Sequence, residues 1–286
     1  MSEGATTGPR RNSAGLARDI EILELLGSPE ATQNGGLGVS RLAKMAGRDK
    51  AVVSRVLTTL HESDLVERDP DTLTYRLGSR IYALAALTAE ATLVRQSRIQ
   101  LRRIAHETRE TAHLCVLRGG NVLTLLSELS PYEFHTTGWE GVTTAAWRTP
   151  SGRVLISDLD RAAIGQWYAE HGHDAAIMSA HRPAAAMPSP FAVLPEPAAE
   201  SARVVDLESL LAEVDRIRRA GFAVSDEELE RGVVAVSAPV FDFNDRIVAA
   251  LNVSAPKARV GGQLDTLARY VARAAREVSA ALGRPG

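Results

Sequence analysis

The chain has 286 residues, 45% of them hydrophobic, enough for one large domain or two smaller ones with a core each. Its net charge is only −2, so a nucleic-acid-binding surface would need a local concentration of positive charge. The single cysteine, Cys115, excludes an internal disulfide and a multi-cysteine zinc site, and the sequence has neither a long apolar run nor a hydrophobic signal region, so we expect a cytoplasmic protein with no membrane partner.

The N-terminal part is predicted to form a tail and then a small helical domain. Residues 1–14 are small, polar and glycine-rich, which is typical of a disordered tail, although Arg10 and Arg11 would also suit contact with a phosphate backbone. Apolar side chains at helical spacing then predict a helix that stops at Gly27. After a polar loop, Ser40 is expected to cap a short second helix.

The next predicted helix, capped by Asp49, has two faces of opposite character. One face is apolar, and the other carries small and basic side chains. Two short helices joined by a tight glycine turn indicate a helix-turn-helix, whose small residues allow close approach to DNA while arginine and lysine donate to phosphates or guanine edges. The residues expected to contact DNA are Ser40, Arg41, Arg48, Lys50, Ala51, Ser54, Arg55, Thr58, Thr59 and Arg68.

Residues 65–68 and 73–77 are predicted to be two short strands around the turn "DPDT", the hairpin that makes a winged helix. Residues 40–60 hold five basic side chains and one acidic, a net of +4, whereas residues 61–73 hold one basic and five acidic, a net of −4. The separation favours insertion of the basic helix into the DNA major groove. The alternative is a winged helix that binds another protein.

The stretch "SRIYALAALTAEATLV" is predicted to be an apolar helix between two domains. We assign residues 15–80 to the DNA-binding domain, 81–96 to this linker helix and 97–286 to a second domain. Pairing of the linker with its copy in a second chain would form a homodimer and imply a pseudo-palindromic double-stranded operator. The alternative is that the linker packs against its own domain.

The second domain is predicted to be α+β. The segments "AHLCVLRG", "NVLTLLSEL", "YEFHTTG", "GVVAVSAPVFD" and "RIVAALNVSAP" have the pattern of strands, and helices are expected from Pro150, over "DRAAIGQWYAEHG", over "DLESLLAEVDRIRRAGF" and from about Gly262. The proline- and alanine-rich residues 173–205 are expected to form a surface excursion. His171, His173 and His181 are loosely spaced and lack patterned acids, so we expect neither a metal nor another cofactor.

Two distant segments carry a family resemblance. "VSRLAKMAGRDKAVVSRVLTTLHESDLVERD" resembles the DNA-binding half of IclR-type bacterial transcription regulators, and "AGFAVSDEELERGVVAVSAPVFDFNDRIVAALNVSAP" resembles their C-terminal signature. The resemblance implies a winged helix, a linker helix and a GAF-like effector-binding domain. It also implies homodimers or dimers of dimers that sense a small organic molecule and repress or activate metabolic genes.

By this resemblance, the effector would contact the turn at Pro150, Ser151 and Gly152 and the strand residues Ser225, Ala235, Asn252 and Ser254. Other members carry an aspartate and a cysteine at the positions of Ser225 and Ala235. A helix N-terminus favours an anion, and Asn252 and Ser254 share one strand face. The aromatic residues Phe134, Trp139 and Trp147 are expected near the same mouth, where they would suit an aromatic or acidic ligand, or else they are core residues.

Catalytic motifs do not appear in the sequence. It lacks a G-x-S-x-G elbow, a P-loop, H-E-x-x-H and a dinucleotide fingerprint. The protein is therefore expected to be a repressor of a catabolic operon and not an enzyme. The alternatives are an activator of the same architecture and a metabolic enzyme with an accessory winged helix.

Overall fold

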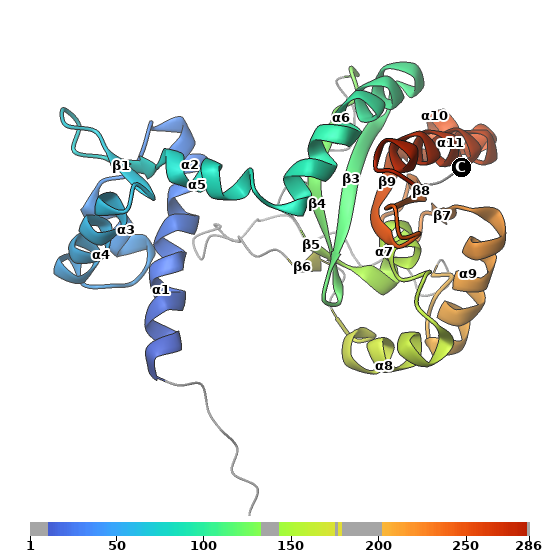
Figure 1. Ribbon diagram of the computed structural model, residues 1–286, viewed down its shortest axis with the longest axis horizontal. Coiled ribbons are helices and arrows are strands. Elements are labelled where there is room, and N and C mark those ends of the chain that lie inside the picture. The colour runs from blue at the N-terminus through green and yellow to red at the C-terminus, as the bar shows by residue number, and fades with distance from the viewer. Residues whose placement is uncertain (1–10, 133–142, 175–176, 179–201, 285–286) are drawn as a thin grey trace, which may run out of the picture. The chain divides into compact units, whose positions relative to one another are not determined.

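The computed structural model describes residues 11–132, 143–174, 177–178 and 202–284 (Figure 1). The chain divides into two compact units, Met1–Ala91 and Thr92–Gly286. Each has its own hydrophobic core.

The first unit is a helical domain with a two-stranded wing. Ile22, Leu42, Val53, Leu57 and Val66 are fully buried at its centre. The antiparallel strands pair Val66 with Leu77 and Arg68 with Tyr75, so the hairpin predicted from the sequence is present. The elements are α1 (Arg11–Leu26), α2 (Pro29–Gln33), α3 (Val39–Met45), α4 (Lys50–Glu62), β1 (Val66–Arg68), β2 (Tyr75–Leu77) and α5 (Ser79–Ala85).

The two helix caps predicted in this unit have different outcomes. Asp49 does cap α4, accepting hydrogen bonds from the backbone N–H groups of Ala51 and Val52 at 2.8 and 3.3 Å. The prediction for Ser40 is wrong, because α3 is capped by Gly38 and Ser40 lies inside its first turn. Leu37 exchanges two backbone hydrogen bonds with Tyr75, so Gly38 is the first residue released from strand-like pairing and the helix starts there.

The linker differs from the single helix predicted for residues 81–96. Helix α5 ends at Ala85, and a new helix, α6 (Ala89–Thr108), runs without a break through the predicted boundary at residue 96. The Thr88 hydroxyl accepts from the Ala91 N–H at 3.3 Å, the pattern of an N-cap, and this cap starts α6. Helix α5 buries none of its residues in the chain, and Tyr82 is 80% exposed.

The second unit is a seven-stranded antiparallel sheet in the order β6-β5-β4-β3-β9-β8-β7. Its strands are β3 (Thr111–Arg118), β4 (Asn121–Glu128), β5 (Thr143–Ala145), β6 (Ile177–Met178), β7 (Ala223–Asp226), β8 (Val233–Phe241) and β9 (Ile247–Pro256). Besides α6, its helices are η1 (Ala146–Arg148), α7 (Pro150–Leu155), α8 (Arg161–His171), α9 (Leu207–Ala220), α10 (Lys257–Val260), η3 (Gly261–Gln263) and α11 (Leu264–Ala281).

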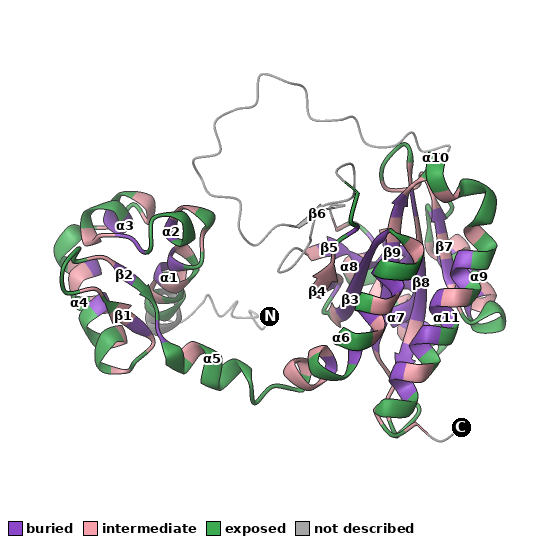
Figure 2. Cartoon of the chain, turned by 90° about the horizontal axis from the view of Figure 1, so that it is seen from above, coloured by how far each residue is buried: buried purple, intermediate pink, exposed green. Residues whose placement is uncertain are grey.

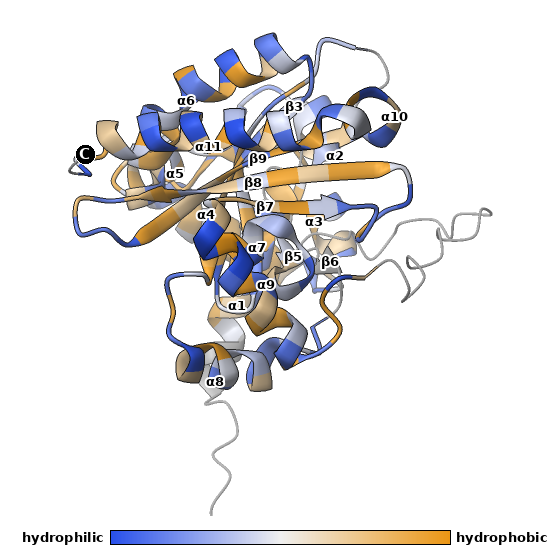
Figure 3. Cartoon of the chain, turned by 90° about the vertical axis from the view of Figure 1, so that its right-hand side faces the viewer, coloured by the Kyte–Doolittle hydropathy of each residue, from blue (hydrophilic) through white to orange (hydrophobic). Residues whose placement is uncertain are grey.

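The sheet has helices on both faces. Helices α6 and α11 lie on one side and α7, α8 and α9 on the other, as Figure 3 shows. Leu114, Val236 and Leu251 point toward α6 and α11 and are fully buried. Figure 2 shows buried residues concentrated on the central strands. Because side chains alternate across a strand, the intervening residues of β3, β8 and β9 point toward α7.

The α+β class predicted from the sequence is confirmed. Four of the five predicted strands are present, as are the predicted helices at Pro150, Arg161, Leu207 and Leu264. From residue 133, the predicted strand "YEFHTTG" lies outside the described residues, as do most of residues 173–205. The short strands β5 and β6 were not anticipated, and β7 was anticipated only in that Ser225 was taken as a strand residue.

We predict that Gly78→Ala destabilises the first unit by about 1–3 kcal/mol, the usual range for forced overpacking. An added Cβ would lie 2.2 Å from the Asp64 carbonyl oxygen, so backbone must move. Gly38 is a matched control, because it also caps a helix in extended backbone and has no atom within 4 Å of an added Cβ. Gly38→Ala should change stability little. Urea unfolding of both variants tests this, and equal midpoints would contradict it.

Candidate functional site

Helix α4 presents one of its faces to solvent. Val53 and Leu57 on the opposite face are fully buried. Lys50, Ala51 and Arg55 are exposed, Ser54 is half-buried, and neither the Lys50 nor the Arg55 side chain has a hydrogen bond or ion pair to any residue that the structure describes. The neighbouring exposed residues Thr58 and Thr59 donate their hydroxyls to the carbonyls four residues earlier. The α4 face therefore has two cations available to a partner.

Two of the arginines predicted to contact DNA are engaged within the unit. Arg41 forms two hydrogen bonds with Glu30, both 2.7 Å long, and this contact lowers the pKa of the Glu30 carboxyl. Arg48 donates to the Arg18 carbonyl at 2.8 Å and to Asp19 at 3.0 Å, and its side chain is only 16% exposed. Arg48 therefore ties α1 to the turn before α4. Sequence spacing did not reveal these pairs, since the partners are distant along the chain.

The wing offers one further cation. The Arg68 guanidinium lies 5.8 Å from the centroid of the Tyr75 ring, which is itself buried. Arg76 is paired with Glu67 across the hairpin at 2.9 Å. Arg68, unlike Arg76, has no ion pair among the described residues and stays the predicted wing contact, and Tyr75 is a core residue of the unit.

The second unit contains a cavity of about 600 Å³ between α7 and the sheet. Six of the residues expected to bind an effector line it, namely Pro150, Ser151, Ser225, Ala235, Asn252 and Ser254. The lining also includes His113, Cys115, Val122, Thr124, Thr144, Thr149, residues 229–234, Pro256 and Ala258. About half of these lining residues have apolar side chains and the others are polar or charged, a combination that suits a small molecule with both kinds of group.

Strand register explains why these residues meet. Ser225 on β7 lies opposite Ala235 on β8, which lies opposite Ser254 on β9. Two residues earlier on β9, Asn252 lies opposite His113 on β3. The Asn252 amide nitrogen donates to Ser254 Oγ at 3.0 Å, so the two side chains that were predicted to share a face do so.

Polar side chains at the inner wall of the cavity contact one another. Ser237 Oγ donates to Ser151 Oγ at 3.3 Å, and His113 Nδ1 lies 2.9 Å from Ser127 Oγ. The Cys115 thiol lies 3.8 Å from Thr124 Oγ1. Burial raises the pKa of Cys115 to about 11, so this thiol stays protonated at neutral pH and is a poor nucleophile.

Four residues expected at the cavity either do not line it or lie outside the described residues. Trp147 is not among the lining residues, since its ring packs with Ile156 and Ile164 in a separate apolar cluster. Gly152 does not line the cavity either; an added Cβ would lie 2.1 Å from the Ala146 carbonyl oxygen, so glycine lets α7 pack closely on η1. Phe134, like Trp139, lies outside the described residues.

Sequence reasoning missed part of the lining. Cys115 was considered only as the single cysteine of the chain, and His113, Thr124 and the connection 229–232 were not considered. The alternation of His113 and Cys115 along one strand was a usable signal, but it needed the pairing of β3 with β9 to acquire meaning.

The described residues contain neither a metal cluster nor a membrane-spanning helix. No cluster of three or more histidine, cysteine, aspartate or glutamate side chains there could hold a metal. His171 Nδ1 lies 3.3 Å from Asp174 Oδ2, and His181 lies outside the described residues. None of the described helices is long and apolar enough to cross a membrane.

Comparison with known proteins identifies the class as ligand-responsive transcription regulators. Residues 15–70 match the IclR helix-turn-helix domain and residues 177–280 match the domain described as "Bacterial transcriptional regulator IclR C-terminal". The chain belongs to the IclR family of bacterial transcription regulators.

The similarity to individual relatives extends over nearly the whole chain. The transcriptional regulator KdgR of Escherichia coli is 25% identical over 92% of this chain and 90% of its own. The IclR of Thermotoga maritima superposes with a TM-score of 0.68 at 19% identity, covering 95% and 99% of the two chains. An IclR homolog from Microbacterium hydrocarbonoxydans, complexed with 4-hydroxybenzoate, gives 0.71 at 19% identity, covering 93% and 98%.

We predict that Arg55→Ala weakens binding to operator DNA about tenfold, because a direct arginine contact contributes about 1–3 kcal/mol. Arg41→Ala should weaken it less, since the Arg41 guanidinium is already paired with Glu30. Fluorescence anisotropy with DNA from the protein's own upstream intergenic region measures both. A larger loss for Arg41→Ala would show that α4 is not the recognition helix.

Proposed function

We propose that this protein is a homodimeric repressor that binds a pseudo-palindromic double-stranded operator and responds to a small aromatic or other organic acid. The observation that carries the DNA-binding half is the exposed face of α4, on which Lys50 and Arg55 have no partner among the described residues. The small residues Ala51 and Ser54 lie beside them and allow close approach to base edges. The family supports the regulatory role.

The proposed dimer uses the apolar side chains of α5 and the residues that follow it. Tyr82, Leu84 and Leu87 are 80%, 52% and 85% exposed, an unfavourable arrangement for a chain on its own. A twofold dimer would present two copies of α4 about 34 Å apart, or a multiple of that distance, and so match two half-sites on one side of the duplex. A dimer of dimers would bind two such sites.

The proposed ligand class follows from the cavity. Its volume of about 600 Å³ is within the range of about 300–1,000 Å³ that is usual for small-molecule sites. Val122, Leu229 and Pro256 supply apolar contacts for a ring, and Ser151, Asn252 and Ser254 supply polar groups. The 4-hydroxybenzoate bound to one structural neighbour supports testing aromatic acids first.

Repression is the direction we propose, and activation by the same architecture is the alternative, since the family's members include both. A ligand alters DNA binding only when it binds the DNA-competent and DNA-incompetent states unequally. A cytoplasmic location, the absence of a cofactor and the absence of catalytic activity belong to the same proposal. An enzyme with an accessory winged helix would instead convert the added acids.

The proposed function is tested by titrating operator binding with salt and then with a panel of aliphatic and aromatic acids. Phosphate contacts give a log–log slope of about −0.9 for each phosphate neutralised. We expect steep salt dependence and a shift in affinity caused by one class of acid. Salt-independent binding would favour a protein partner, and turnover of an acid would favour an enzyme.

We predict that Asn252→Ala raises the concentration of acid needed for half-maximal response about tenfold, because removing one polar contact in a buried site costs about 1–3 kcal/mol. DNA binding without ligand should remain within about twofold, since Asn252 belongs to the second unit. Asn244→Ala, in the exposed β8–β9 turn, is the control and should leave the response unchanged. Equal responses of the two variants would remove Asn252 from the ligand site.

A further inference from the structure

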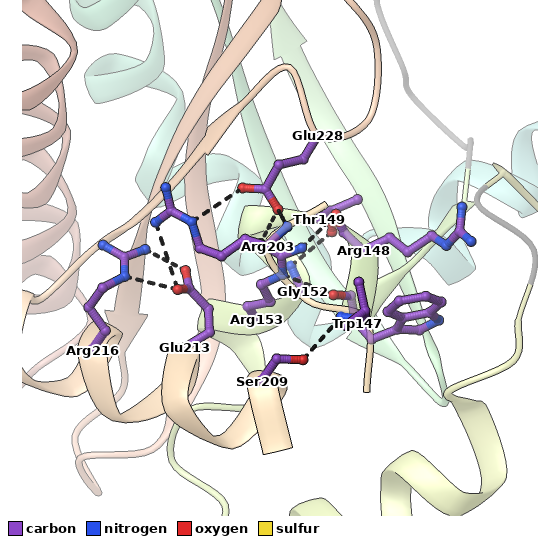
Figure 4. A network of polar contacts seen from close by, with 11 residues as sticks. Trp147, Arg148, Thr149, Gly152, Arg153, Arg203, Ser209, Glu213, Arg216 and Glu228 are labelled. Carbon is purple, nitrogen blue, oxygen red and sulfur yellow. Dashed lines mark hydrogen bonds and ion pairs between the residues drawn. The ribbon is translucent and has the colours of Figure 1, made fainter. Parts of the chain in front are cut away.

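Arg153 of α7 is the most deeply buried cation among the described residues. Its side chain is 2% exposed, and that of its partner, Glu228, is 3% exposed. Arg153 donates from Nη1 to Glu228 Oε2 at 2.8 Å and from Nε to the Trp147 carbonyl at 2.9 Å. Figure 4 shows its guanidinium between the η1–α7 turn and the Glu228 carboxylate.

The Arg153–Glu228 pair joins two walls of the cavity without lining it. On one side, Arg153 holds the turn from which Thr149, Pro150 and Ser151 line the cavity. On the other side, Glu228 belongs to the connection between β7 and β8, of which residues 229–232 line the cavity. The ends of this connection are held by backbone hydrogen bonds from Glu227 to Val233 and from Lys257 to Gly232, and Glu228 adds a side-chain attachment to α7 through Arg153.

Stability alone explains this pair poorly. Desolvation offsets much of the attraction in a buried ion pair, and apolar replacements of similar volume are often no less stable. Glu228 Oε1 is buried with no hydrogen-bond partner, while Oε2 also accepts from the Arg203 backbone N–H at 3.2 Å. The hydrogen bonding of the Glu228 carboxylate is therefore incomplete. The clearest effect of the pair is to fix the β7–β8 connection relative to the α7 turn.

We infer that Glu228 is a positioning residue of the effector pocket, which through Arg153 holds the connection 229–232 against the α7 turn. Arg203, 3.8 Å from both Glu228 and Glu213, extends the network to α9. The inference rests on the proposed ligand role of this cavity. It concerns a residue that does not itself touch the cavity.

Glu213 provides a matched control. Its side chain is also 3% exposed and also pairs with an arginine, Arg216, through a hydrogen bond of 2.9 Å. It lies on α9, none of whose residues lines the cavity. Glu213→Gln and Glu228→Gln therefore each remove one buried negative charge from the same network, but only Glu228→Gln releases a cavity wall.

Cys115 makes the position of the wall measurable without any ligand. It is the only cysteine of the chain, it lines the cavity and it is 4% exposed. Its rate of labelling by methyl methanethiosulfonate, a small uncharged thiol reagent, therefore reports opening of the cavity. We expect Glu228→Gln to raise this labelling rate about tenfold or more, because loss of a charge-assisted hydrogen bond makes local opening easier. Glu213→Gln should change the rate less than about twofold.

Labelling at several low urea concentrations separates local opening from global unfolding. Local opening predicts a rate in Glu228→Gln that barely changes with urea, whereas global unfolding predicts a rate that rises with the full denaturant dependence of unfolding. Equal labelling of both variants, or labelling of Glu228→Gln that follows its global stability, would overturn the inference. If Glu228→Gln does not fold, Glu228→Asp, which keeps the charge and shortens the reach, allows the same comparison.

A second arm uses benzoate and 4-hydroxybenzoate as probes. If either acid protects Cys115 in the parent protein, Glu228→Gln should require about tenfold more acid for equal protection, and Glu213→Gln should not. If neither acid protects Cys115, the aromatic part of the proposed ligand class loses its support. The ligand-free difference between the two variants still decides whether Glu228 positions the wall.

Discussion

The alternation of side chains along β9 is the constraint on which the second unit depends. Leu251 and Val253 enter the core beneath α11, and this fixes Asn252 and Ser254 on the face toward α7. A register slip of one residue would exchange the two sets and place polar groups in the core. The same apolar packing that makes the sheet stable therefore places the polar groups of the cavity.

The opposite wall depends on a close approach of backbone. At Gly152 there is no room for a Cβ between α7 and η1, and the buried Arg153 side chain holds the turn on the other side. Both residues lie in α7, a helix of six residues. A helix this short is not stabilised or oriented by the helix propensity of its residues alone. Tertiary contacts therefore determine where Ser151 is presented, and the β7–β8 connection is attached to the same point through Glu228.

The sequence predicted what depends on local pattern and missed what depends on pairing over long distances. Periodicity located most of the longer helices, the wing and the alternating strands, and Asp49 identified the start of α4, but the predicted polar loop after Gly27 contains the short helix α2. It did not locate β5, which has only three residues, or the break after Ala85, which depends on the Thr88 cap within a strongly helical composition. It also could not separate Arg41 and Arg48 from Arg55, because their charges are equivalent until Glu30 and Asp19 are placed beside the first two.

The same limit applies to the cavity. Ser225, Asn252 and Ser254 were found through a family signature, whereas His113 and Cys115 were missed because they enter the site only through the pairing of β3 with β9. Trp147 was expected near the mouth of the cavity or, as the alternative, in the core. In the fold, neighbouring residues of a tight turn point in different directions, and the indole packs into the Ile156 and Ile164 cluster instead.

The break between α5 and α6 constrains how a ligand signal reaches DNA. The second half of α6 is fixed in the core of the second unit, with Leu101 and Ile104 fully buried and Arg103 paired with Glu277 of α11 at 2.6 Å. A rigid rod that transmits rotation would need one continuous helix from the wing to this core, and residues 86–88 interrupt it. Under the proposed function, a ligand signal would have to cross this break, for example by changing where α6 begins or how the exposed α5 side chains pair with a partner. The largest change in DNA affinity that a ligand can cause is set by how much more tightly it binds one state of the protein, DNA-competent or DNA-incompetent, than the other.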